Sequence, residues 1–327
     1  MTNSVRPRYW LIEASAVALS VLLWPASSYA CSVCGCGDPL IVASDPAAIE
    51  GMLRVQFDTE HLGMTAGSDE RTGYLDRLSQ WSYRFNVAYR PIRRLSVIAT
   101  LPVLDKTIRS VGVGTDELAS HEVGVGDVEL AVRYAVWRDV SFSHRRAQEI
   151  ALSLGSSLPT GPHDAKTTDA GEVVPVDPHG QVGTGGFGPF VGLHYRFEQG
   201  DWMGYTDLSY RLRTTATYFD HSTYKFGDAV LGGVHAQYRP LPALVADLGL
   251  DARFARVDQA AAPDQSSPST VPNTGGTVLS LAPGLYGKII GGLWLFGRVQ
   301  LPIYQHLSGE QDIGIVAAVG VQYEVLN

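Results

Sequence analysis

Apolar and polar residues alternate along much of this chain, and this alternation limits the folds that it can adopt. In residues 81–90, WSYRFNVAYR, the odd positions from Trp81 to Tyr89 are apolar or aromatic, whereas even positions such as Arg84 and Arg90 are mostly polar. Successive side chains of a β-strand point to opposite faces, so this segment would have one apolar and one polar face. A helix would spread both sets around its axis. The pattern therefore predicts strands.

The same alternation recurs down the chain. It is present in residues 127–136, 189–198, 206–213, 228–239, 245–254 and 316–325. Alternating stretches divided by turns are typical of membrane β-barrels, and we count about twelve of them. They lie near residues 51–60, 78–90, 94–105, 123–137, 147–159, 186–198, 202–214, 224–239, 243–256, 277–289, 292–305 and 312–326. The prediction is an all-β fold, a transmembrane antiparallel barrel over residues 51–327.

The connections between these segments differ in length in a regular way. Residues 91–93, 199–201, 240–242 and 290–291 are short, whereas residues 61–77, 106–122, 160–185 and 257–276 are long and polar. Residues 138–146 form a long connection at a position where the alternation of short and long connections predicts a short one. Short turns at one end and long loops at the other favour an outer-membrane barrel, with periplasmic turns and outer loops, over a soluble β-sandwich. Closure would also pair the strand edges that an open sheet leaves free.

The amino-terminal residues predict export. Arg6 and Arg8 precede an apolar run over residues 14–24, Pro25 ends the run, and small residues flank Tyr29. This is the pattern of a secretory signal peptide over residues 1–30, because the run is too short for a permanent transmembrane helix. We expect the mature chain to lie in the lipid bilayer of a bacterial outer membrane. The net charge of −8, without basic clusters, argues against nucleic acid as a partner.

Four phrases of the sequence resemble those of one family of barrels. They are GVGDVELAVRYAVW (124–137), SLGSSLPTGP (153–162), FGDAVLGGVHAQYRP (226–240) and VQLPIYQHLSGEQ (299–311). They are similar to strand and turn phrases of the outer-membrane proteins labelled as transporters of a meta-cleavage phenol-degradation pathway. The resemblance implies a barrel related to hydrocarbon-uptake channels, which would pass small hydrophobic or amphipathic solutes. It implies no catalytic residues, and we expect the protein not to be an enzyme.

In each alternating segment, the polar positions predict which side chains face the interior of the barrel. The candidate lumen-lining residues are Arg84, Glu129, Arg133, Arg196, Asp207, Arg211, Asp251, Arg253 and Arg298, with further charges at Arg54, Asp58, Arg213 and Asp247. Both signs are interleaved, so no selectivity ring of one charge is predicted. The charges either pair to support the wall or line a wet path for a polar or amphipathic solute. A barrel of this size predicts a narrow or partly plugged channel.

The histidines add two hypotheses. His194 and His235 fall on the inward parity, where we expect them to form hydrogen bonds, and His179 falls in a long loop where we expect it to be solvated. His306 and Ser308, in HLSG, resemble the His-x-Ser pair of the outer-membrane phospholipase, so lipid hydrolysis is a further alternative. The strand parity predicts that His306 points inward, away from lipid.

All cysteines lie close together, directly after the predicted signal peptide. They are Cys31, Cys34 and Cys36, in CSVCGCGDP. Thiolates at this spacing, in a turn with glycines, suit Cu(I), or Zn with a fourth ligand such as His61. An oxidising periplasm favours instead a disulfide with one thiol left over, and a cysteine at the first mature position would accept a lipid. The metal, disulfide and lipid interpretations all stay open.

Residues 31–50 would then form a cysteine-rich segment before the first strand, either in the periplasm or as a plug in the lumen. Two main functions follow from this organisation. The first is an outer-membrane channel for small solutes, with a thiol cluster that binds a soft metal. The second is a non-conducting barrel that anchors a Cu(I)-loaded or redox-active segment for a periplasmic partner.

Overall fold

The structure is a computed structural model that describes residues 50–68, 74–112, 118–141, 143–169, 172–265 and 267–326. The predicted signal peptide, Cys31, Cys34 and Cys36 lie outside these residues. The described residues form strands and turns, with no helix among them. In this part of the chain there is thus no helix with the length and apolar character needed to cross a membrane.

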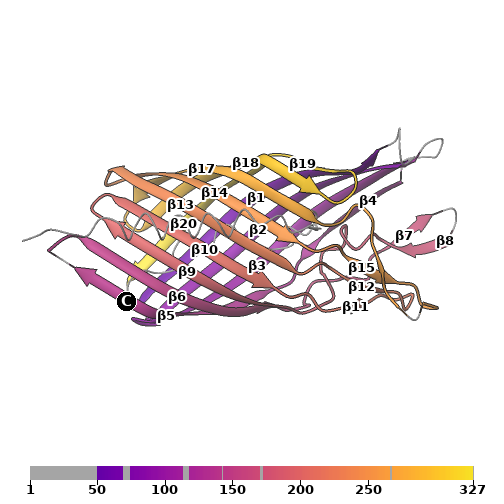
Figure 1. Cartoon of the computed structure of the whole chain (residues 1–327), viewed down its shortest axis with the longest axis horizontal. Helices are drawn as coiled ribbons and strands as arrows, with labels where there is room; N and C mark the ends of the chain where they lie inside the picture. The colour runs from indigo at the N-terminus through magenta and orange to yellow at the C-terminus, as the bar shows by residue number, and fades with distance from the viewer. Residues whose placement is uncertain are drawn as a thin grey trace, which may run out of the picture.

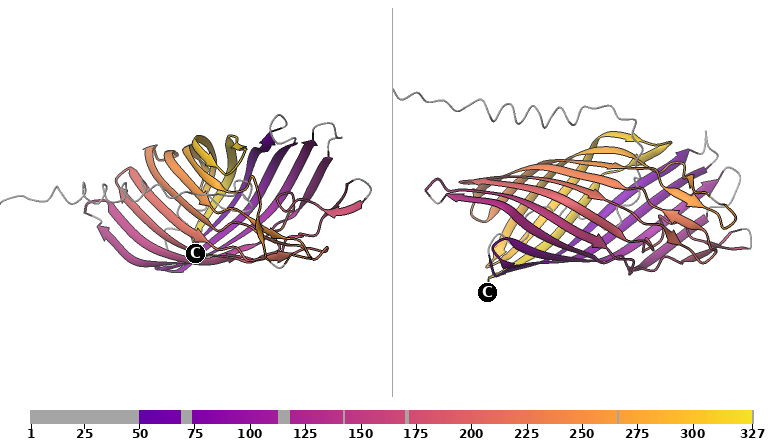
Figure 2. Two further views of the ribbon diagram at one scale, coloured as in Figure 1. Left: turned by 45° about the vertical axis from the view of Figure 1, so that its right-hand side comes forward. Right: turned by 60° about the horizontal axis from the view of Figure 1, so that its bottom comes forward.

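The described residues confirm the predicted antiparallel barrel of twelve strands. Its elements are β1 Met52–Ser68, β2 Tyr74–Ile92, β3 Leu95–Gly112, β4 Leu118–Val125, β5 Glu129–Ser141, β6 Arg146–Ser157, β9 Gly188–Gln199, β10 Trp202–Arg211, β13 Ala229–Leu241, β14 Leu244–Ala255, β17 Gly276–Ile290, β18 Leu293–Leu307, β19 Gln311–Ile313 and β20 Val316–Leu326. Each is antiparallel to its neighbours, and the strands run obliquely to the long axis (Figures 1 and 2).

Two of the twelve barrel strands are interrupted. β4 and β5 pair in turn with β3, and β19 and β20 pair in turn with β1. The ladder between β1 and β20 runs from Met52 opposite Leu326 to His61 opposite Ala317, and it closes the barrel. Closure leaves the barrel with no free first or last strand, as a sheet in hydrocarbon requires, and only the short β4 and β19 pair on one side alone among the described residues.

The two faces of the wall differ as the alternation predicts. Phe57, Phe85 and Leu101 are direct neighbours on β1, β2 and β3, and each exposes 40% to 47% of its surface outward. The next residues along, Asp58 and Arg84, face each other on the inside and expose 0% and 1%. Exposed apolar side chains and buried charges are the reverse of a soluble domain. The outer face is therefore the surface that meets lipid.

The ends of the barrel are also asymmetric. Residues 93–94, 200–201, 242–243 and 291–292 turn the chain at one end, and β5 and β6 are joined at the same end by residues 142–145, fewer than predicted. The other end carries the long connections and their small strands (Figure 1, right). These are β7 Lys166–Asp169, β8 Glu172–Pro175, β11 Ala216–Thr217, β12 Thr223–Lys225, β15 Gln259–Ala261 and β16 Ser269–Thr270.

Two of the predicted loops are wrong. The sequence predicts loops over residues 61–77 and 106–122, but β1 and β2 extend far into the first range, and β3 and β4 cover most of the second. The polarity of the wall is inverted there. Leu62, Met64 and Ile108 pack together inside, with Leu78, Val278 and Ile313 in the same cluster. Outward side chains at this level, such as Arg77 and Ser79, are polar and exposed.

An aromatic boundary explains this inversion. Trp81 is exposed on the outer face, and its ring lies 4.6 Å from the ring of His61, centroid to centroid. Trp and Tyr side chains gather where a barrel leaves the hydrocarbon. Beyond this level the wall stands in water, so its polar outer face resembled a loop in the sequence.

Candidate functional site in the barrel interior

The interior of the barrel is filled by paired charges. Arg84 donates from Nε to Asp58 Oδ2 at 2.8 Å and from Nη2 to Glu60 Oε2 at 2.8 Å. Gln56 and Asn86 each donate to the other oxygen of Asp58 at 3.0 Å. These residues come from β1 and β2, whose register places them opposite one another. A buried carboxylate that accepts several bonds holds its guanidinium partner in one geometry.

A second group of charges lies on β5, β6, β9 and β10. Arg211 donates to Glu129 at 2.6 Å, and its guanidinium carbon lies 4.4 Å from the centroid of the Phe190 ring. Arg90 on β2 donates to Glu149 at 2.9 Å, across the interior. In the order of the sheet, two strands separate the partners of each pair, so both pairs connect non-neighbouring strands of the wall.

His235 on β13 is the centre of a third group. Its ring stacks on Tyr205 with centroids 4.5 Å apart and an interplanar angle of 2°. Nδ1 lies 3.2 Å from Asp247 and Nε2 lies 3.0 Å from Asp251, which also pairs with Arg298. Nε2 also lies 3.0 Å from Nη2 of Arg298, so the imidazole joins two carboxylates and a guanidinium in one buried network.

His194 on β9 has a similar environment. It forms a short contact with Asp207 through Nδ1, and Nε2 lies 2.8 Å from the Ser153 hydroxyl. His194 and His235 are therefore hydrogen-bonded inside the barrel, as the sequence predicts.

The predicted lumen-lining residues all lie on the inner face of the wall. They are Arg84, Glu129, Arg133, Arg196, Asp207, Arg211, Asp251, Arg253 and Arg298. The structure brings five of them, Glu129, Arg133, Asp207, Arg211 and Asp251, to one internal cavity of about 90 Å³. Arg84 belongs to the separate group on β1 and β2. Whether these residues line a path for a solute stays a prediction.

Part of one long loop folds back into the barrel. This inner loop, residues 158–187, joins β6 to β9, and its residues 176, 179–184 and 186 are buried. Lys106, on the inner face of β3, donates to the carbonyl oxygens of Gln181 at 2.7 Å and His179 at 3.2 Å. Val182 packs against Gly124 on the inner face of β4. The inner loop therefore narrows the interior at the end with the long connections.

A carboxylate between β4 and β5 clamps both ends of the inner loop. Asp127 accepts bonds from the backbone N–H of Gly161 at 2.9 Å, the N–H of Thr184 at 2.9 Å and the Thr184 hydroxyl at 2.5 Å. Gly161 and Gly183 touch backbone to backbone, so a side chain at Gly183 would collide with the Gly161 carbonyl. Two of the phrases that carry the family resemblance, Gly-Asp at 126–127 and Leu-Pro-Thr-Gly at 158–161, thus meet in space.

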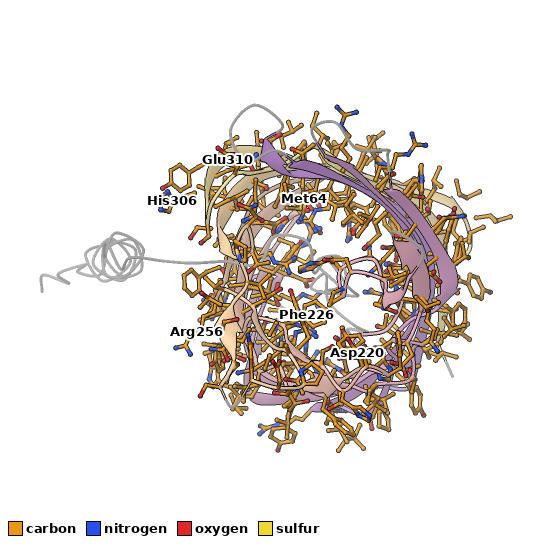
Figure 3. All side chains as sticks on the ribbon, turned by 90° about the vertical axis from the view of Figure 1, so that its right-hand side faces the viewer. Met64, Asp220, Phe226, Arg256, His306 and Glu310 are labelled. Carbon is orange, nitrogen blue, oxygen red and sulfur yellow. The ribbon has the colours of Figure 1, made fainter. Side chains whose placement is uncertain are left out.

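Asp258 joins three of the long connections. Its carboxylate accepts bonds from the Tyr224 hydroxyl at 2.6 Å and the Gly227 N–H at 2.7 Å, and it lies 2.9 Å from Nε2 of His179. Figure 3, an end view, shows Phe226 inside the ring of strands, and its ring packs edge-on against His179. The expectation that His179 is solvated is wrong, because the loops pack on one another.

A second carboxylate lies on the other side of the same imidazole. Asp177 Oδ1 is 3.0 Å from Nδ1 of His179 and also accepts its backbone N–H at 2.8 Å. Partial desolvation would raise the pKa of Asp177, but the charge and hydrogen bonds of His179 outweigh it and lower this pKa below its usual value.

The expectation for His306 is also wrong. β18 contains a bulge where Leu279 pairs with Tyr304 and Ser280 pairs with Pro302. The extra residue reverses the parity, so His306 is exposed outside the wall (Figure 3). The hydroxyl of Ser308 is buried and has no hydrogen-bond partner among the described residues. The two side chains are therefore not arranged as a base and its nucleophile.

The metal hypothesis falls largely outside the described residues. Cys31, Cys34 and Cys36 are not among them, and His61 lies on the outer face, beside Trp81 and Ser79. Within the described ranges, no three His, Cys, Asp or Glu side chains are grouped to hold a metal ion.

Sequence reasoning missed the residues that hold the inner loop. Lys106, Asp127 and Asp258 act through contacts between loops and wall, which a strand pattern does not contain. Asp127 could have been found from the sequence, because it belongs to the Gly-Asp phrase that carries the family resemblance. No motif surrounds Asp258.

The comparisons with known proteins support the fold. No protein-family model matches the chain, and the search of curated proteins gives no match. An outer-membrane channel from Pseudomonas putida F1 is similar, with a TM-score of 0.60 and 10% identity over 86% of this chain and 98% of that one. At this identity the likeness extends to the barrel fold alone.

Two further solved structures are less similar. The translocator domain of the autotransporter NalP from Neisseria meningitidis has a TM-score of 0.49 and 13% identity, over 95% of this chain and 97% of that one. The CymD monoaromatic hydrocarbon channel has a TM-score of 0.42 and 11% identity, over 92% of this chain and 95% of that one.

Proposed function

We propose that the protein is an outer-membrane channel for small solutes. The observation that carries the proposal is a closed barrel with an apolar outer face and a cavity among charged side chains inside. A barrel built only as a wall has no need of internal space, and a protein of this strand number is wider than the barrels that side chains fill completely. The solved channel from Pseudomonas putida F1 has the same fold and supports this assignment.

The solutes that fit this interior are amphipathic. Near the end with the long connections, the inner face carries the apolar cluster of Leu62, Met64, Leu78 and Ile108, and the charged groups follow further inside. A solute would therefore meet an apolar surface first and paired charges next. The family resemblance of the sequence points to the same class of small hydrophobic or amphipathic molecules.

Planar-bilayer recording of the purified full chain tests the channel. We expect discrete conductance steps, and we expect Ser209→Phe to reduce the conductance several-fold because Ser209 lines the internal cavity. Leu208→Phe is the matched control, since Leu208 is the adjacent residue and is exposed on the lipid face. A barrel that inserts but never conducts would refute the proposal and favour the anchoring alternative. Equal loss in both variants would show that the cavity is not the path.

The soft-metal role of Cys31, Cys34 and Cys36 is a separate proposal, supported by the C-x2-C-x-C spacing alone. Metal analysis of anaerobically purified protein should give about one Cu(I) per chain, as a three-thiolate trigonal site implies. The triple Cys→Ser variant should bind none. Thiols that are already a disulfide or acylated in the exported protein, seen by mass spectrometry, would exclude the metal site.

A further inference from the structure

Among the residues that the structure describes, one charged side chain of the internal cavity has no hydrogen-bond or ion-pair partner. Arg133, on the inner face of β5, exposes 7% of its surface and lines the cavity of about 90 Å³. Its Nε is fully buried, and neither this atom nor the rest of the guanidinium has a hydrogen-bond or ion-pair partner among the described residues. The other charged groups of the cavity are paired: Glu129 with Arg211, Asp207 with His194, and Asp251 with Arg298 and His235.

Charges of both signs lie around Arg133 at longer range, and among the described residues none of them forms an ion pair with it. The carboxylates of Asp207 and Glu149 are within electrostatic reach, but so are the guanidinium groups of Arg90 and Arg54. Asp207 is already paired with His194, and Glu149 is already paired with Arg90. A buried charge without a close counter-charge is costly, so the site favours any anion that can enter it.

Part of the wall beside Arg133 is apolar. Ala131, on the same strand, packs with Ile98 and Phe190 in a buried cluster that also borders the cavity. Gly232 and Gly233 also border the cavity. A side chain at Gly233 would meet Asp251 Oδ1 at 2.8 Å, so Asp251 and His235 limit the cavity on that side. A guanidinium beside an apolar surface matches a carboxylate with a hydrocarbon body, because arginine binds both carboxylate oxygens at once.

We propose that Arg133 binds the carboxylate of a small organic acid inside the barrel, with the hydrocarbon part against Ile98, Ala131 and Phe190. This site rests on the proposed channel and names its solute class. The cavity is smaller than the ~150 Å³ that holds benzene in an engineered protein, so the ligand is a short-chain acid of a few carbon atoms. A doubly charged inorganic anion fits less well, because Arg133 is the one cation of the lining without an ion pair among the described residues, and the carboxylates of Glu129, Asp207 and Asp251 line the same cavity.

Binding is tested with propionate on the full chain in detergent. Saturation-transfer NMR should show that propionate binds and that 1-propanol, its neutral analogue, does not. Arg133→Gln should weaken propionate binding at least tenfold, and Arg133→Lys should retain part of it. Arg54→Gln is the matched control, since it removes the same charge from another inner position, where Arg54 is paired with Glu324 at 2.6 Å. It should leave propionate binding nearly unchanged.

A structural role for Arg133 makes different predictions. Because Arg133→Gln removes a buried charge that has no ion pair within the described part of the chain, the urea midpoint of the variant should equal or exceed that of the wild type. A lower midpoint would mean that Arg133 supports the wall, and it would overturn the site. Equal loss of propionate binding in Arg54→Gln, or equal binding of chloride and propionate, would show a general charge effect and would overturn it too.

The channel and the site can fail separately. Planar-bilayer recording in a gradient of potassium propionate should give a reversal potential that shifts toward the cation-selective side in Arg133→Gln. Conductance without propionate binding would refute the binding site but not the channel. Propionate binding without any conductance would refute the channel but not the binding site.

Discussion

Replacing Asp127 with alanine is expected to raise the single-channel conductance several-fold. The carboxylate of Asp127 accepts three bonds from the two ends of the inner loop, whose residues 179–184 are buried in the barrel. A fully buried donor that loses its acceptor costs about 1 to 3 kcal/mol, and these three are part-buried, so their joint loss should still detach the loop from this side of the wall. The barrel itself should survive, because Asp127 lies between β4 and β5 and outside their pairing with β3.

Two variants make this experiment specific. Asp127→Asn keeps one acceptor oxygen and should give an intermediate conductance, since its amide nitrogen cannot accept from Thr184. Asp105→Ala removes the same charge from the outer side of β3, where Asp105 is half-exposed beside His121, and should change nothing. If Asp127→Ala folds, as its heat-modifiable gel mobility would show, and still conducts like Asp105→Ala, the inner loop does not limit the path.

Much of this barrel is predictable because one physical rule applies to every strand. In hydrocarbon the outward side chains must be apolar, so parity alone separates Phe57 and Phe85 from Asp58 and Arg84. The same rule predicts that the charged side chains lie on the inner face, even though their partners are unknown. The lengths of the connections then distinguish the end with short turns from the end with long loops.

The rule fails where its premise fails. Above Trp81 the wall leaves the lipid, and Arg77 and Ser79 face water, so residues 61–77 resemble a loop although most of them form strand. A bulge in β18 shifts the inward–outward alternation by one residue, so His306 faces outward. The sequence contains no residue type that predicts this bulge.

Partners inside the barrel are still harder to predict. In the sequence, Arg133 and Arg211 are both arginines at inward positions, and nothing distinguishes them. In the structure Arg211 pairs with Glu129, whereas Arg133 has no such partner among the described residues. Which strands face one another across the interior depends on the tilt and closure of the whole barrel. The same holds for Lys106, whose partners are backbone carbonyls of the inner loop.

The largest loss of stability is expected from Arg84→Met. Asp58 and Glu60 both pair with this guanidinium, and Asp58 exposes 0% of its surface. Removing the cation leaves two buried carboxylates that repel each other, and breaking a buried pair in this way costs about 3 to 5 kcal/mol. Urea unfolding of the barrel in lipid vesicles, followed by tryptophan fluorescence, measures the change in the free energy of unfolding.

Arg93→Ala is the matched control for Arg84→Met, because it removes an arginine whose pair with Glu50, at 3.1 Å, is exposed to solvent. Water screens such a pair, so its loss should barely change the free energy of unfolding. The triple variant Arg84→Met, Asp58→Asn, Glu60→Gln should recover most of the loss, since neutral amides do not repel and can still donate to neighbouring oxygens. A triple variant as unstable as Arg84→Met would show that the guanidinium stabilises the wall through its packing, not through its charge.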